Sequence, residues 1–408
     1  MMARCIVAGV LAGGLAVAGC AGPSQQPAPA ADAGPLVPRF RYDKSFPQPL
    51  PNQWKLGHVT GVAVDARDHI WIIHRPATLK NSEVEATDKT TYGGGGNTGA
   101  VPNLGPLALC CRPAPPVIEF DQKGNVVQGW GGPGTGYEWP TPGAKSPDRA
   151  LGSAPFGERG IHVDAGDNVW VGSDGPGDGQ LLKFSRFGKL LYQFGAQGRS
   201  KGSNDVQNVN GAVAFAVNPA SNEVFVADGR RNRRVLVLDA YAGTYKRHWG
   251  AYGKPPDDSV PTPEYAPDPK SPQFGELHGM ALSRDGLLYV ADRVNNRIQV
   301  FKTDGTFVKE GVVAPDTRGG SAYDIAFSAD PAQHYAYVVD GMNQQVWILL
   351  RETLETIGSF GYGGHYGGAF NAAWVIATDK SGNIYVGEGW ESKRVQRFLY
   401  TGMGPAPR

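Results

Sequence analysis

The chain has 408 residues, with 39 lysines and arginines against 38 aspartates and glutamates, a formal net charge of +1 and a pI near 7.7. This balance excludes a protein whose overall charge drives it onto nucleic acid or an anionic membrane surface. The 57 glycines and 32 prolines indicate many turns, and no long apolar segment of helical period follows the N-terminal region. These features predict an all-β protein.

The N-terminal region has the pattern of an export signal. A short start that ends in the basic Arg4 precedes the apolar or small residues 5–18, a run too short to span a bilayer as a helix. Val17-Ala18-Gly19-Cys20 resembles the lipobox, at which bacterial lipoproteins are cut and lipidated. We expect residues 1–19 to be a lipoprotein signal peptide, with an ordinary secretory signal as the alternative. Cys20 would then be the lipidated N-terminus of an exported cell-envelope protein, anchored to a membrane and facing the periplasm.

Residues 20–39 are rich in Ala, Pro, Gln and Gly and have no apolar period, which predicts a disordered tether. Residues 40–403 are expected to form a single domain. A long loop insertion at residues 77–115 interrupts its first repeat. The Pro- and Gly-rich links between repeats fall at the same end of the predicted domain as this insertion, and loops gathered over one end of a scaffold commonly bind ligands.

Six similar strands occur along this domain, at residues 61–65, 160–164, 214–218, 279–283, 324–328 and 375–379. After each strand come a tight turn rich in Asp, Asn and Gly and a second strand with an aromatic residue at its centre, which is a repeated β-hairpin signal. Third and fourth strands follow, but the last repeat lacks a fourth. The segment Gln53–Gly57 has the matching pattern and is expected to supply it. The sequence therefore predicts a single six-bladed β-propeller in which an N-terminal strand closes the last blade.

The segment 291–301, Ala-Asp-Arg-Val-Asn-Asn-Arg-Ile-Gln-Val-Phe, closely resembles the signature of the NHL repeat. Across nearly the whole predicted domain, the repeats resemble the peptidyl-α-hydroxyglycine α-amidating lyase domain and its bacterial relatives, which are NHL propellers. This resemblance implies three histidines that hold a zinc ion in the central channel, a catalytic arginine and a catalytic tyrosine. It also implies a channel calcium ion held by backbone carbonyls at positions that match Val62 and Ile161.

The family's functional residues are largely replaced in this sequence. The six channel positions that could carry a zinc ligand hold Thr60, Arg159, Val213, His278, Tyr323 and Trp374. Only His278 matches a ligand, because the other two ligand positions carry Arg159 and Trp374. Arg230 follows the Ala-Asp pair at the position of the catalytic tyrosine, whereas the arginine is retained as Arg75. These replacements argue against an active zinc-dependent lyase, unless His74, His162 or His365 supplies new ligands.

Four arginines are expected near the channel mouth, namely Arg75, Arg159, Arg230 and Arg293. Converging guanidinium groups are suited to binding a carboxylate or a phosphate. The alternative is a salt-bridged cluster with Asp228 and Asp292 as partners. Tyr323 and Trp374 are expected to add aromatic contacts to the ligand, with simple packing of the channel as the alternative.

The adjacent residues Cys110 and Cys111 are the two remaining cysteines after the signal and the lipidated Cys20. In an oxidising compartment they are expected to form a disulfide, and two separate thiols are the alternative.

Together, these observations predict a lipid-anchored propeller that binds an anionic small molecule, a peptide or an envelope protein on its loop-rich face. The alternative is a divergent amidating-lyase-like enzyme in which Arg75 would be catalytic. The sequence assigns no cofactor: the resemblance leaves a structural calcium ion in the channel open, and His278 alone is not expected to hold zinc tightly. We expect a monomer that contacts the membrane only through its lipid and does not bind nucleic acid.

Overall fold

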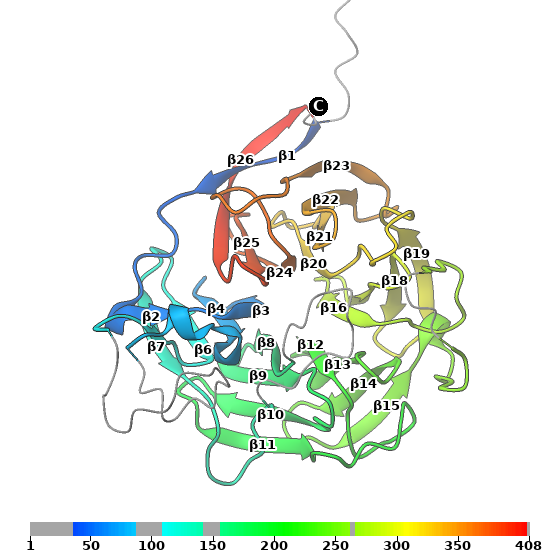
Figure 1. The fold of residues 1–408 in the computed structure, drawn as a ribbon. Coiled ribbons are helices and arrows are strands. Elements are labelled where there is room, and N and C mark those ends of the chain that lie inside the picture. The colour runs from blue at the N-terminus through cyan, green and yellow to red at the C-terminus, as the bar shows by residue number, and fades with distance from the viewer. Residues whose placement is uncertain (1–35, 87–107, 142–155, 262–265, 406–408) are drawn as a thin grey trace, which may run out of the picture. The chain divides into compact units, whose positions relative to one another are not determined.

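The computed structural model describes residues 36–86, 108–141, 156–261 and 266–405. Their strands form six four-stranded antiparallel sheets around a common axis (Figure 1). From the axis outward, blade one consists of β3 (His58–Val64), β4 (Ile70–Arg75), β6 (Val117–Phe120) and β7 (Val126–Trp130). Blade two consists of β8 (Glu158–Val163), β9 (Asn168–Ser173), β10 (Gln180–Ser185) and β11 (Leu190–Gly195). Blade three consists of β12 (Ala212–Asn218), β13 (Glu223–Asp228), β14 (Arg234–Asp239) and β15 (Tyr245–Trp249). Blade four consists of β16 (Leu277–Leu282), β17 (Leu287–Asp292), β18 (Arg297–Lys302) and β19 (Phe307–Val312). Blade five consists of β20 (Asp324–Phe327), β21 (Tyr335–Asp340), β22 (Gln345–Leu350) and β23 (Thr356–Phe360). Blade six consists of β24 (Ala373–Thr378), β25 (Ile384–Glu388), β26 (Val395–Pro405) and β1 (Leu36–Asp43).

The innermost strands contact one another in the order β3, β8, β12, β16, β20 and β24, and β24 contacts β3 again. This ring confirms the predicted all-β six-bladed propeller. The described helices are the short turns η1 (Pro51–Gln53), η2 (Pro76–Thr78), η3 (Asn81–Glu83) and η4 (Ala251–Gly253). In the described residues no helix has the length and apolar character needed to cross a membrane.

An N-terminal strand closes the last blade, as predicted, but it is β1 and not the segment Gln53–Gly57. Strand β1 pairs antiparallel with β26, with Val37 opposite Gly404 and Tyr42 opposite Phe398. Trp54 and Lys55 instead form β2 (Trp54–Lys55), which pairs in parallel with β5 (Arg112–Pro113) inside the predicted insertion. The propeller thus spans residues 36–405 of the described chain, slightly more than the expected 40–403.

The central aromatic residue of each second strand is buried between neighbouring sheets. These six residues are at most 2% exposed: Trp71, Trp170, Phe225, Tyr289, Tyr337 and Tyr385. The turn before such a strand is held by its own first residue. In blade one, Asp65 Oδ1 accepts the backbone N–H groups of Arg67 (2.8 Å) and His69 (2.9 Å), a side-chain interaction that favours a tight turn.

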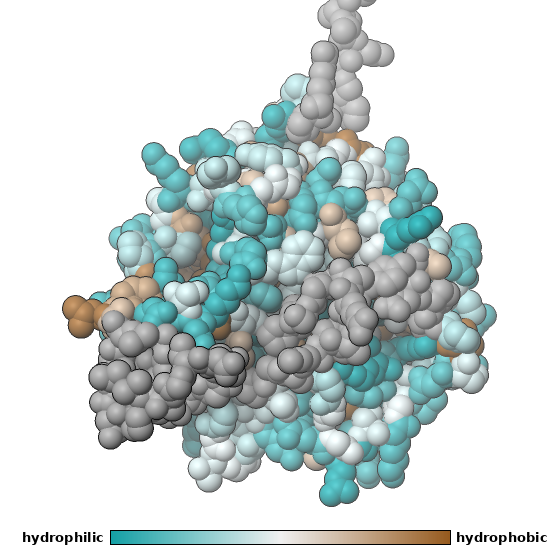
Figure 2. Space-filling view, in the orientation of Figure 1, coloured by the Kyte–Doolittle hydropathy of each residue, from teal (hydrophilic) through white to brown (hydrophobic). Residues whose placement is uncertain are grey.

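The two ends of the propeller differ in their connections. Tight turns join the first and second strands of each blade at one end, whereas the insertion in blade one and the links between blades lie at the other end. Hydrophilic residues predominate on the face shown in Figure 2, and apolar residues form small separate groups there. The end with the long connections carries the candidate site.

Candidate functional site

A β-bulge lies near the start of most innermost strands, at the end of the channel that we call the channel mouth. Four residues have no partner in the pairing between the first and second strands of their blades: Thr60, Val213, His278 and Trp374. A bulge turns the side chain of the extra residue in a new direction. In blade two the bulged residue is Gly160, with φ of 69°, while Arg159 stays paired with Gly172. Arg159 therefore sits differently in its strand from His278, although the two align in sequence.

Arg75 and Arg159 share one carboxylate, that of Asp174. Arg75 Nη2 lies 2.7 Å from Asp174 Oδ1, and Arg159 Nη1 donates to Asp174 Oδ2 at 3.0 Å. All three side chains are buried. Burial opposes ionisation of the carboxyl, but the positive charges of the nearby arginines lower the pKa of Asp174 to about 2. We call Arg75, Asp174 and Arg159 the Asp174 bridge.

Arg230 and Arg293 share a second carboxylate in the same way. Arg230 Nη1 donates to Glu276 Oε1 and Arg293 Nη2 donates to Glu276 Oε2. Arg293 Nη1 also donates to the carbonyl oxygen of Gly319 at 2.8 Å. Burial again opposes ionisation, and the arginines lower the pKa of Glu276 to about 2. We call Arg230, Glu276 and Arg293 the Glu276 bridge.

His278 lies within the electrostatic reach of both bridges. Burial lowers its pKa well below the ordinary value, and the charges of Arg159, Arg293 and Arg230 lower this pKa further. The ring is therefore neutral, with Nδ1 2.9 Å from the carbonyl oxygen of Tyr323. Arg159 also interacts with Glu276, and Arg230 with Asp174. The two bridges thus form one electrostatic network around His278.

Tyr323 and Trp374 lie against opposite parts of this network. The rings of Tyr323 and His278 are 4.5 Å apart between centroids, and the Arg293 guanidinium lies 5.2 Å from the Tyr323 ring centre. The Arg75 guanidinium lies 5.8 Å from the Trp374 ring centre. The structure thus places all six predicted binding residues around the channel mouth, with the aromatic rings stacked beside arginines.

The acidic partners expected from the sequence, Asp228 and Asp292, are the wrong ones. Each binds the arginine that begins the third strand of its own blade: Arg234 Nε donates to Asp228 at 2.8 Å and Arg297 Nε donates to Asp292 at 2.9 Å. These aspartates and arginines are completely buried. They fix the strand connections and are not available to the channel arginines.

Asp174 and Glu276 were missed as site residues, although the repeats contained a signal for Asp174. It stands four positions after Trp170, just as Arg75 follows Trp71 and Arg293 follows Tyr289. Equivalent positions of a propeller meet around its axis, so opposite charges at one repeat position predict an ion pair there. Glu276 lies in the link before β16, where no comparable repeat pattern identifies it.

The residues at the mouth do not fit a zinc ion. His278 is accompanied by three permanently cationic guanidinium groups, which repel a dication and offer no lone pair. Both ring nitrogens of His74 are engaged, with Gly57 N–H and with the carbonyl oxygen of Pro115. His162 lines the channel, and the Nε2 atom of His365 lies 3.4 Å from Asn371 Nδ2.

Next to the mouth, the channel contains a cavity of about 330 Å³ lined by the innermost strands of all six blades. Val62 and Ile161, the positions implied for a calcium ion, are among the lining residues. Calcium binding at these positions stays a prediction.

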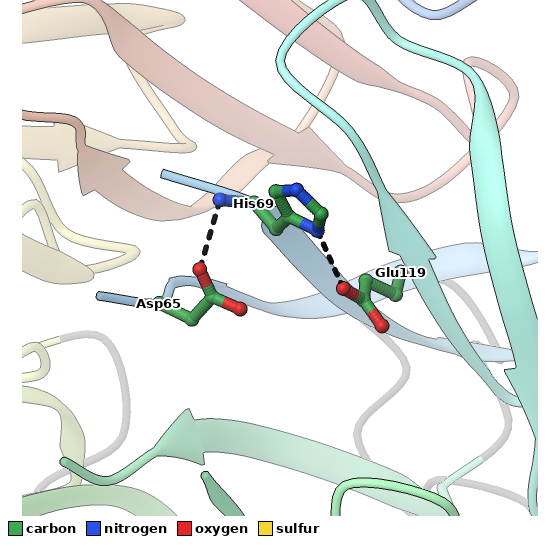
Figure 3. A group of neighbouring side chains, drawn as sticks. All are labelled: Asp65, His69 and Glu119. Carbon is green, nitrogen blue, oxygen red and sulfur yellow. Dashed lines mark hydrogen bonds and ion pairs between the residues drawn. The ribbon is translucent and has the colours of Figure 1, made fainter. Parts of the chain in front are cut away.

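A second group of titratable residues, Asp65, His69 and Glu119, lies in blade one (Figure 3). His69 Nδ1 is 2.6 Å from Glu119 Oε1, and its backbone N–H donates to Asp65. Arg186 from blade two binds both carboxylates. Together with Arg67, which also binds Asp65, this guanidinium supplies the two compensating positive charges, so the group is an ionic link between blades and not a metal centre.

The structure joins Cys110 and Cys111 in a disulfide. The predicted lipidation site, Cys20, and the predicted signal peptide lie outside the described residues.

The fold and the mouth define a class of protein: a six-bladed β-propeller with a buried arginine network at one end of its channel. Residues 274–301, which lie in blade four, match the family model described as "NHL repeat". The chain is 32% identical to mouse peptidyl-glycine alpha-amidating monooxygenase over 157 residues, which cover 37% of this chain and 14% of the mouse protein, and the rat protein matches to the same extent. A solved structure titled "Streptogramin B lyase structure" aligns with 90% of this chain and 98% of its own, with 11% identity and a TM-score of 0.47.

These findings confirm an NHL-repeat six-bladed β-propeller that is distantly similar to the amidating enzyme. The matched part represents about a seventh of the length of the curated relatives.

Proposed function

We propose that the channel mouth of this propeller binds an anionic ligand, a small molecule, a peptide or a group on an envelope protein, through Arg75, Arg159, Arg230 and Arg293. The observation that carries this proposal is an excess of positive charge among the largely buried groups that the structure describes at the mouth. Four guanidinium groups share two carboxylates, Asp174 and Glu276. Both carboxyls have pKa values lowered to about 2 and are ionised at neutral pH.

A purely structural salt-bridge cluster would balance its charges. Arg234 with Asp228 and Arg297 with Asp292 show this arrangement within the same protein, one buried carboxylate for each buried arginine. Burying a charge without compensation costs several kcal/mol. The channel network departs from this balance, which supports a role in binding a negatively charged group.

The competing hypothesis is a divergent lyase-like enzyme that uses Arg75. The distant similarity to an amidating monooxygenase favours it. However, Arg75 is held by Asp174 and by the carbonyl oxygen of Glu158, and the mouth does not fit the zinc ion that the family chemistry requires. We therefore favour binding over catalysis.

We further propose that this binding takes place at the cell envelope. The lipobox-like sequence ending in Cys20 supports export and lipid anchoring to a membrane, with the propeller as a periplasm-facing monomer. The near-neutral net charge supports a partner other than nucleic acid.

The test is to measure ligand affinity in variants that remove one guanidinium each. A thermal-shift screen of anionic metabolites and carboxyl-terminated peptides would supply a ligand. Each charge-assisted hydrogen bond contributes about 1.5 to 3 kcal/mol, so Arg159→Ala and Arg230→Ala should each weaken binding at least about tenfold in calorimetric titrations. The melting temperature should change little, because Asp174 keeps Arg75 and Glu276 keeps Arg293 as partners.

The matched control is Lys189→Ala, since this exposed lysine lies in the tight turn between β10 and β11. Its affinity should equal that of the wild type. Equal affinity of Arg159→Ala and the wild type would exclude the arginine network as the binding site. Stabilisation by zinc alone would favour the lyase hypothesis instead.

A further inference from the structure

The charge balance of the two bridges specifies the ligand more closely. Each bridge contains two guanidinium groups and one carboxylate, so each carries one net positive charge. The bridges act on one another, since Arg159 interacts with Glu276 and Arg230 with Asp174. Among the described residues, the network as a whole therefore has two more positive charges than negative charges, and most of its side chains are buried.

The charged groups next to the network do not remove this excess. Arg231 and Asp178, which interact electrostatically beside the network, add one positive and one negative charge and leave the excess unchanged. Burial raises the pKa of Glu158, so this carboxyl is a weaker source of negative charge than Asp174 or Glu276, and the ring of His278 is neutral. Burial also raises the pKa of Asp324 to about 7, so below that pH this residue is mostly uncharged.

Each bridge also has one buried donor left over. Arg159 Nη2 and Arg293 Nε have no hydrogen-bond partner among the described residues, and both residues are 5% exposed. Buried donors in folded proteins are almost always paired. Each bridge thus offers one N–H donor to a ligand oxygen, and a negative charge on that oxygen would balance the positive charge of the bridge.

We infer that the ligand is a dianion, with one negative charge for each bridge, held between Arg159 of the Asp174 bridge and Arg293 of the Glu276 bridge. Two chemical classes share this property: a single oxyanion with two charges, such as a phosphate monoester or sulfate, and a dicarboxylate. A planar guanidinium group suits the oxygen atoms of either class. This inference rests on the proposed anion site and narrows its ligand.

The experiment compares sulfate with methyl sulfate, two probes of similar shape that carry two charges and one charge. Titrations at pH 6 and constant ionic strength keep Asp324 protonated in both. We expect sulfate to bind at least tenfold more tightly than methyl sulfate. A second comparison tests a phosphate monoester and succinate, each against its singly charged methyl ester or monoamide. It is made at pH 7.5, where both dianions keep two charges and Asp324 is mostly ionised in every titration. The class with the larger preference over its singly charged analogue is the dianion that binds better.

Two variants change the net charge of the network in opposite directions. Arg159→Gln reduces it by one and should remove most of the preference for sulfate, whereas Glu276→Gln raises it by one and should preserve the preference. Equal binding of sulfate and methyl sulfate by the wild-type protein overturns the inference and leaves the anion site intact. Failure of every anion to bind overturns the proposed function itself. Because the wild-type comparison decides the question, poor folding of a variant does not.

Discussion

Asp324 shows how the channel changes the chemistry of a single side chain. Its Oδ2 accepts the backbone N–H of Ile376 at 3.0 Å, and its Oδ1 accepts the N–H of Ile325 at 2.9 Å. Burial raises the pKa of Asp324 from 3.8 to about 7, although these two bonds and the charge of Arg159 oppose the shift. The folded protein therefore holds a proton that the unfolded chain releases at a lower pH.

This shift predicts a pH-dependent effect of Asp324→Asn. The folded pKa lies above the unfolded value, so the stabilising contribution of the protonated acid is complete below pH 4 and is lost as the pH rises through 7. Asparagine cannot ionise and keeps an oxygen for Ile376. Because Asp324 lines the channel cavity and keeps partial contact with solvent there, the full pKa shift overstates the energy. We expect the variant to be about 2 kcal/mol more stable than the wild type at pH 8 and nearly equal at pH 4. Thermal unfolding at both pH values measures this difference, and a difference independent of pH would contradict it.

At this scale the sequence identified the basic and aromatic residues of the mouth but not the acids that hold them. Arg75, Arg159, Arg230 and Arg293 stand out because they replace or match positions of a recognisable repeat. Asp228 and Asp292 occur close to these arginines in sequence, yet their carboxylates bind Arg234 and Arg297 within their own blades. Short sequence separation favoured the wrong pairing, since Asp174 and Glu276 are distant in sequence and each also binds an arginine of a neighbouring blade, Arg75 and Arg230.

The element that closes the ring illustrates a different limit. Strand β1 contains Pro38 and follows Pro35, and such residues suggested a tether. Proline lacks an N–H donor and is tolerated on an edge strand, and β1 is the outermost strand of its sheet. Its pairing with β26 shifts register between Pro38 and Phe40. The segment Gln53–Gly57 matched the pattern of a fourth strand more regularly than β1 does. Its residues Trp54 and Lys55 instead pair with Arg112 and Pro113 of the insertion.

We predict that removal of β1 destabilises the whole propeller. Deleting residues through 43 uncovers the edge of β26, removes the fully buried Val37 and separates Arg397 from Asp43. Losing the buried apolar surface of Val37 and Phe40 should lower the free energy of unfolding by at least about 3 kcal/mol. Deleting residues through 34 leaves β1 intact and should have no effect. Denaturant unfolding of the two truncated proteins measures the difference.

A pair of point variants on β1 separates packing from chain shortening. Phe40 packs on Phe360 and Tyr337, with ring centroids 4.9 and 5.4 Å apart, whereas the adjacent Arg41 is exposed. Phe40→Ala should destabilise the protein and Arg41→Ala should not. Equal stability of both variants would show that β1 contributes little to closure.

At the scale of the whole molecule, closure and binding are placed in different regions. The chain enters the propeller on β1, the outermost strand of blade six (Figure 1). The arginine network lies at the innermost strands and the connections next to them. An attachment before Leu36 is thus joined to the rim of the blades and not to the channel.

This separation allows membrane anchoring and ligand binding to be tested independently. We predict that Cys20→Ser abolishes lipidation and releases the protein from the membrane fraction, because several acyl chains are needed for stable attachment. The anion affinity and the melting temperature of the released protein should equal those of the wild type, since residue 20 lies outside the propeller strands. Fractionation of cells that express each form measures the release, and titration of the purified proteins measures the affinity. Recovery of Cys20→Ser protein in the membrane pellet would show that another part of the chain binds the membrane, and a lost affinity would show that the N-terminal segment takes part in the site.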